Sequence, residues 1–137
     1  MKALCLAVIC AAVSTVYAAE RAVELPPAVV EAFESYTALP DTLVPVLQQA
    51  RDQSSAKTAA PALKQVLTHI YETREKLHKM PRLTPGQNQE VRLRYAQQMR
   101  EEWGRLYAEI VRIRDARCFQ SVEFAQAFRL MCMMIEK

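Results

Sequence analysis

The side chains best suited to chemistry in this chain are sulfur groups near its carboxyl end. Methionine and cysteine fill positions 131–134 without interruption, and His78 and Met80 lie farther back in the sequence. Thiolate and thioether sulfur favour Cu(I). Consecutive residues of a helix point in different directions, so the run suits an adaptable buried helix end better than one metal shell. We therefore expect no metal and no other cofactor, and a copper-binding envelope protein is kept as an alternative.

Other catalytic arrangements are poorly represented. His69 and His78 lie nine residues apart on one predicted helix, which is not a metal-ligand spacing. The sequence contains neither a glycine-rich phosphate loop nor a nucleophile elbow. The acidic residues mostly have basic partners at helical spacing, as in the pairs Glu72 with Lys76 and Glu75 with Lys79. We expect a protein that is not an enzyme and has no catalytic residues.

A strip of small, aromatic and basic residues follows the longest predicted helix. Gly104, Ala108 and Val111 form one side of it, and Arg100 and Tyr107 adjoin them. A solvated helix gains nothing from glycine and valine, and glycine costs about 1 kcal/mol relative to alanine. Another helix or a partner is therefore expected to pack there, and these five residues are the candidate partner surface.

The elements that would carry these residues are all helical. The chain has two glycines, lacks strand-forming runs, and is rich in Ala, Leu, Gln, Glu, Arg and Lys. Apolar residues recur at helical spacing in several segments and predict core-facing stripes. One consists of Ala56, Ala60, Leu63, Leu67, Ile70 and Leu77, and another of Met99, Trp103, Leu106, Ile110 and Ile113. We predict a small all-α bundle built on a long antiparallel helical hairpin, about 56–79 and 85–116, with two short N-terminal helices that meet at Pro40 and a C-terminal helix over about 122–136.

Capping residues mark the predicted helix ends. Thr84 and Gln87 have the spacing of a capping box, and Ser121 suits the start of the last helix. Pro61 is expected to kink its helix or to mark the true start, with Thr58 as the cap.

A short loop at 80–83 would connect the two long helices as direct neighbours. Counting outward from it, the expected cross-helix pairs are Ile70 with Tyr95, Leu67 with Met99, Leu63 with Trp103 and Ala60 with Leu106. Leu67 is thus expected in the core, where truncation is costly, and Arg105 on the opposite, solvated face.

The amino terminus has the pattern of a secretory signal peptide. Lys2 precedes an apolar run at 3–13, and Val16 and Ala18 are the small residues of a cleavage site. The run is shorter than the roughly 20 residues that a membrane span needs. We expect residues 1–18 to be a signal peptide, and 19–137 to form a single exported domain, periplasmic or extracellular, without a membrane span.

Two cysteines, Cys118 and Cys132, remain after the expected cleavage. One precedes the Ser121 cap and the other lies eleven residues beyond it, so we expect no disulfide between them within one chain. The formal net charge of +3, lowered by one when Lys2 is removed, is too small to indicate nucleic acid as a partner.

Two resemblances accompany these patterns. The string Leu83-Thr84-Pro85-Gly86-Gln87 resembles the L-T-x-x-Q motif of periplasmic stress proteins of the Spy/CpxP type, which would imply a chaperone-like role. A wider pattern over residues 48–128 resembles helical hairpins of uncharacterised secreted bacterial proteins, and it implies a fold without an activity. Its elements are Asp52-x-x-Ser55-Ala56, Ala60-Pro61-x-Leu63, Tyr95-x-x-x-Met99 and Leu106.

The sequence thus favours an exported, non-enzymatic helical protein that binds protein or peptide partners, or a second copy of itself, through a helical surface. The chaperone-like stress protein and the copper-binding protein are the alternatives.

Overall fold

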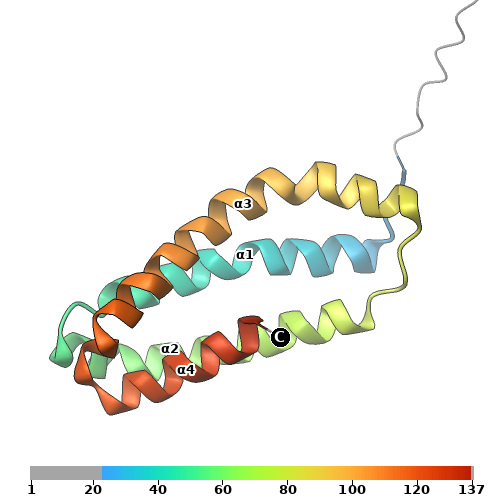
Figure 1. The fold of residues 1–137 in the computed structure, drawn as a ribbon. Helices are drawn as coiled ribbons and strands as arrows, with labels where there is room; N and C mark the ends of the chain where they lie inside the picture. Colours follow the sequence, from blue (N-terminus) through green and yellow to red (C-terminus); the bar gives the residue numbers. More distant parts are fainter. Residues whose placement is uncertain (1–22, 137) are drawn as a thin grey trace, which may run out of the picture.

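The computed structural model describes residues 23–136, which fold into helices without a strand (Figure 1). The elements in chain order are α1 (Pro27–Gln49), α2 (Gln53–Lys79), α3 (Pro85–Asp115), the short turn η1 (Arg117–Gln120) and α4 (Val122–Glu136). The predicted small all-α bundle is confirmed. The predicted signal peptide and its cleavage site lie outside the described residues.

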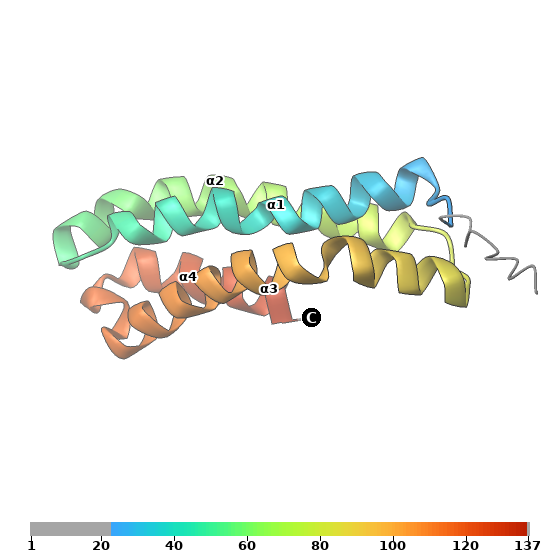
Figure 2. The ribbon, with the colours of Figure 1, turned by 90° about the horizontal axis from the view of Figure 1, so that it is seen from above.

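Helix α1 lies between α2 and α3 and packs against both, while α4 packs against α2 (Figures 1 and 2). Each helix runs antiparallel to the one before it. Within residues 23–136, no Cα atom of α2 lies within 8 Å of a Cα atom of α3. The two long helices are antiparallel as predicted, but the expectation that they pack directly in the register Leu63 to Trp103 and Leu67 to Met99 is wrong.

The length of the connection explains this difference. The loop between Lys79 and Pro85 contains five residues, which reach about 17 Å when extended. Packed helix axes lie 8–10 Å apart, so the diagonal of a four-helix arrangement is roughly 11–14 Å, within the reach of the loop. The length of the loop therefore allows α3 to lie either beside α2 or diagonally opposite it. The diagonal position is taken because α1 packs its apolar faces against both helices.

Helix α1 is continuous, whereas two short helices meeting at Pro40 were predicted. A proline inside a helix removes one hydrogen bond and costs about 3 kcal/mol. Leu39, Leu43 and Leu47 recur every four residues across the proline, and all three are buried. Their burial against α2 and α3 offsets the local cost, so tertiary packing overrides the break that Pro40 signals.

Helix α2 begins earlier than predicted, at Gln53. The Asp52 carboxylate accepts a hydrogen bond from the Ser55 backbone N–H at 2.8 Å, and the Ser55 hydroxyl oxygen accepts one from the Asp52 N–H at 3.0 Å. The hydrogen bonds that the Ser55 N–H and the Ser55 hydroxyl donate to the Asp52 carboxylate lower the pKa of Asp52. Thr58 is not the cap, because its hydroxyl donates to the Ser54 carbonyl inside the helix, and Pro61 is accommodated in the helix interior.

Helix α3 begins with the predicted capping box. The Thr84 hydroxyl accepts a hydrogen bond from the Gln87 N–H at 3.2 Å, and the Gln87 side chain accepts one from the Thr84 N–H at 3.0 Å. The Ser121 cap of α4 is also present, because its hydroxyl accepts a hydrogen bond from the Phe124 N–H. The sequence therefore predicted the starts of α3 and α4 from their caps, whereas it missed the Asp52 cap of α2.

Replacing Thr84 by alanine should lower the free energy of unfolding by about 0.5–2 kcal/mol, since it removes one partner of the box and leaves helical N–H groups without an acceptor. Chemical denaturation monitored by circular dichroism measures this change. Thr68→Ala on the exposed face of α2 is the control and should change stability little. Equal effects of the two variants would argue against the cap.

The buried face of α3 matches the predicted apolar stripe, whereas the buried face of α2 is rotated about the helix axis relative to the predicted one. Trp103, Leu106, Ile110 and Ile113 are buried as expected. On α2 the buried residues are Ala56, Ala59, Ala60, Leu63, Val66, Ile70 and Thr73. Leu67 and Leu77, which were predicted on the core face, are only half-buried. The apolar face of α2 is turned toward α1 and α4, because these helices are its neighbours.

Polar side chains connect the helices at several places. Lys76 forms an ion pair with Glu31 of α1 at 2.9 Å instead of the expected pair with Glu72, while the expected pair between Glu75 and Lys79 is present at 3.6 Å. The Lys76 pair is exposed and therefore weak.

Arg112 is a stronger connection. Its guanidinium donates to the carbonyl oxygens of Leu47 and Ala50 at 2.8 and 2.9 Å, and its Nε donates to Glu109 at 2.8 Å. The last carbonyls of a helix lack the usual N–H donor one turn further on, so the Arg112 guanidinium gives those of Leu47 and Ala50 a donor and holds α3 against the end of α1. The Leu47 carbonyl also accepts from the Ala50 N–H at 3.2 Å.

The turn η1 reverses the chain between α3 and α4. Its four residues, none of them glycine, have φ between 48° and 59°. Each such residue costs about 1–2 kcal/mol in this left-handed region. The Arg112 guanidinium lies 5.7 Å from the centre of the Phe119 ring, and the Gln53 amide donates to the Gln120 carbonyl at 3.4 Å. These contacts stabilise a turn that the sequence did not predict.

Candidate functional site

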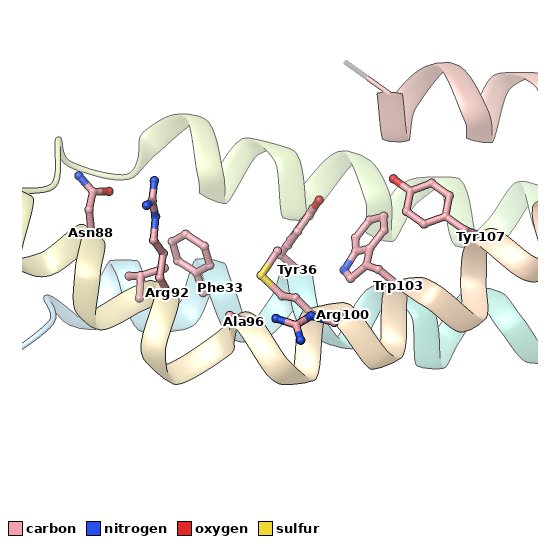
Figure 3. Close-up of a pocket in the computed structure, with 10 residues that line it drawn as sticks. Phe33, Tyr36, Asn88, Arg92, Ala96, Arg100, Trp103 and Tyr107 are labelled. Carbon is pink, nitrogen blue, oxygen red and sulfur yellow. The ribbon is translucent and has the colours of Figure 1, made fainter.

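A groove lies between α1 and α3 and is here called the α1–α3 groove (Figure 3). Its volume is about 570 Å³. The lining residues are Phe33 and Tyr36 of α1 and Asn88, Val91, Arg92, Ala96, Met99, Arg100, Trp103 and Tyr107 of α3. Most of these side chains are aromatic or aliphatic, and the polar ones are Asn88 and the two arginines.

Stacked rings give the groove a rigid floor. Tyr36 stacks on Trp103 with ring centres 4.5 Å apart, and Tyr107 lies 6.1 Å from Trp103. Phe33 stacks in the same way on Tyr95, at 5.5 Å. Such pairs fix ring positions beyond what burial alone does. The α1–α3 groove is therefore formed before any ligand arrives.

Two polar groups of these rings are buried without a hydrogen-bond partner among the described residues. They are Trp103 Nε1 and the Tyr95 hydroxyl. Burial raises the pKa of Tyr36, and the neighbouring Tyr107 raises it further. Tyr36 is thus a neutral phenol at neutral pH, which suits hydrogen bonding better than acid–base chemistry.

A second hollow, of about 250 Å³, adjoins the α1–α3 groove and shares Tyr36 and Trp103 with it. Its other lining residues come from α1, α2 and α4, and they are Leu39, Ile70, Arg74, Leu77, His78, Met134 and Ile135. The Arg74 guanidinium donates to the Met134 carbonyl at 3.3 Å, which ties the end of α4 to α2. The two hollows meet at Tyr36 and Trp103, which line both, and together they are here called the depression.

The charges around this depression have one sign. The titratable basic groups that line it are Arg92, Arg100, Arg74 and His78, and no aspartate or glutamate lines either hollow. Arg92 and Arg100 are exposed, and neither forms an ion pair within residues 23–136. The depression therefore favours an anionic ligand with an apolar body.

The predicted partner surface is exposed, but its residues belong to different hollows. Tyr107 and Val111 are each 52% exposed, and a Cβ built on Gly104 would have no atom within 4 Å. Arg100 and Tyr107 line the α1–α3 groove, whereas Ala108 lines a separate hollow beside Pro40. Neither α1 nor α4 covers the strip.

Sequence reasoning overlooked Phe33, Tyr36 and Arg92 as site residues. Their signal was weak, because aromatic residues at helical spacing on α1 are equally compatible with a core. Only the position of α1 against α3 brings these side chains beside Trp103 and Arg100.

The sulfur run at 131–134 does not converge on one point. Met131 is buried, Cys132 and Met134 are half-buried, and Met133 is 47% exposed. No group of three or more His, Cys, Asp or Glu side chains in the described residues is placed to hold a metal ion. His69 and His78 are exposed.

Cys118 and Cys132 are free thiols in the structure. Burial raises the pKa of both, so neither is activated as a nucleophile.

No family model, curated protein or solved structure matches this chain in the comparisons. None of the described helices combines the length and the apolar character that crossing a bilayer requires. The likeness of residues 83–87 to L-T-x-x-Q proteins stays a hypothesis, and the capping box at Thr84 and Gln87 accounts for the same letters.

Proposed function

We propose that this protein is an exported, non-enzymatic binding protein that takes up protein or peptide partners in the α1–α3 groove. The observation that carries the proposal is an aromatic groove of about 570 Å³, lined by Trp103, Tyr36 and Tyr107 and bordered by Arg92 and Arg100. Tryptophan, tyrosine and arginine are the residues that contribute most to protein interfaces.

Two further features support binding over catalysis. The stacked rings hold the groove open in a fixed shape, which lowers the ordering cost of binding. The chemistry at the groove consists of apolar surface and positive charge, with a neutral Tyr36 and without a nucleophile beside a base. Arg100 and Tyr107 of the predicted partner surface belong to this groove, so the sequence-based surface and the groove overlap.

A photo-crosslinking residue in place of Ala96 tests the proposal. Ala96 is exposed and lines the α1–α3 groove, so the probe should form covalent adducts with a partner when the exported protein is irradiated in its own compartment. Gel shift and mass spectrometry identify the adduct.

The same probe at Gln97, which is exposed but does not line the groove, is the control. Adducts confined to position 96 support the proposal. Adducts of equal yield at both positions, or at position 97 alone, would reject it. Gly104→Leu tests whether the part of the predicted surface outside the groove also contacts the partner. The added side chain meets open space in the monomer, so the variant should fold normally. Loss of the adduct in this variant would extend the surface to Gly104, Ala108 and Val111.

A further inference from the structure

Resting on the proposed function, we propose that the partner of the α1–α3 groove is an acidic amphipathic helix. It would lie along α3, with its apolar face on Trp103 and Tyr36 and its carboxylates on Arg92 and Arg100. The shape of the depression, the end of α4 and the sign of the charges carry this inference independently.

The shape of the depression fits a helix. On α3 its lining extends from Asn88 to Tyr107, which corresponds to about 28 Å, or roughly five helical turns. Its outer edge is exposed at Arg92, Ala96 and Arg100. An amphipathic helix covers such an open trough with its apolar face and leaves its polar face in water. An acyl chain in the same place would keep part of its apolar surface exposed.

The fold also leaves room for a helix at this position. Helix α4 has 15 residues, whereas α2 has 27 and α3 has 31. In Figure 1, α4 covers only the half of α2 that adjoins η1. The bond from Arg74 to the Met134 carbonyl marks where this cover ends, and Leu77 beyond it is only half-buried. Among the described residues, no helix continues α4 along the rest of α2.

The charges select the kind of helix. Arg92 and Arg100 lie eight residues apart on α3, a spacing of about 12 Å along the axis. Glutamates seven or eight residues apart on a partner helix would face both guanidinium groups, and guanidinium and carboxylate form strong paired hydrogen bonds. No acidic side chain of the depression competes for them. A basic or neutral helix would leave both arginines unpaired.

The single tryptophan of the chain provides the readout, because Trp103 lies at the centre of the depression. Two synthetic amphipathic peptides of about 18 residues without tryptophan, identical except for Glu or Gln at positions seven apart, would be titrated while Trp103 fluorescence is recorded. The Glu peptide should bind at least about tenfold more tightly, and added salt should reduce this preference. Vesicles of phosphatidylglycerol would be titrated in parallel.

The double variant Arg92→Gln, Arg100→Gln should lose the preference for the Glu peptide while keeping its helical circular dichroism, since both side chains are exposed and neither forms an ion pair with another described residue. Arg51→Gln, Arg129→Gln removes the same charge from exposed positions outside the depression and should keep the preference. Equal binding of both peptides, no binding of either, or tighter binding of the vesicles would overturn this inference. Adducts at position 96 would still support the proposed function after any of these results, so the two failures are distinguishable.

Discussion

Leu63→Ala should lower the free energy of unfolding by about 2–5 kcal/mol, the range found when a fully buried leucine is truncated. The Leu63 side chain is 0% exposed at the centre of the core that α1, α2, α3 and α4 share. Its removal leaves a cavity that these helices can fill only by shifting together. Denaturant unfolding followed by circular dichroism, with the slope of the transition checked for constancy, measures the loss.

Leu67→Ala is the matched control, four residues further along α2. Its side chain is half-buried, so truncation removes less buried surface and should cost clearly less than at Leu63. The sequence pattern placed Leu67 on the core face, whereas the structure rotates it toward the edge. A larger loss for Leu67→Ala than for Leu63→Ala would show that α2 faces α3 after all and would contradict the fold described above.

Arg112→Ala should destabilise the bundle by about 2–3 kcal/mol, since a hydrogen bond from a charged group contributes about 1.5–3 kcal/mol and the Ala50 carbonyl loses its side-chain donor. The variant removes both bonds to the carbonyls of Leu47 and Ala50 and the contact with the Phe119 ring. Thermal and denaturant unfolding should both report the loss. Hydrogen exchange should also speed up in the last turn of α1.

Arg105 provides the comparison, because it lies two turns earlier on α3 and also carries an ion pair, with Glu102 and Asp41. Its side chain is 62% exposed, and such surface pairs contribute under about 1 kcal/mol. Arg105→Ala should therefore change stability little, as the sequence had indicated. Equal losses for Arg105→Ala and Arg112→Ala would mean that Arg112 does not hold α1 in the way its hydrogen bonds suggest.

The sequence correctly indicated the features that lie within a single helix. The capping box at Thr84 and Gln87, the Ser121 cap and the apolar stripe of Trp103, Leu106, Ile110 and Ile113 all appear as predicted. These features depend on residues three or four positions apart, and helical geometry fixes how such residues lie relative to one another.

The sequence was least informative about breaks. Pro40 was expected to separate two helices and Pro61 to mark a kink or a start, yet both lie inside helices. Conversely, η1 turns left-handed at four residues that are not glycine. In each case the local preference is a few kcal/mol, which burial of several leucines or a hydrogen-bonded arginine can offset.

The sequence by itself determined that this protein is all-helical, where most of its helices begin and end, and which side of α3 is apolar. Only the tertiary structure decided that α1 separates α2 from α3, and hence that Tyr36 meets Trp103 and that Arg92 borders the same groove as Arg100. The reason is one of range. Helices form from interactions within one turn, whereas the choice of neighbours depends on how whole apolar faces fit, and a five-residue loop permits more than one arrangement.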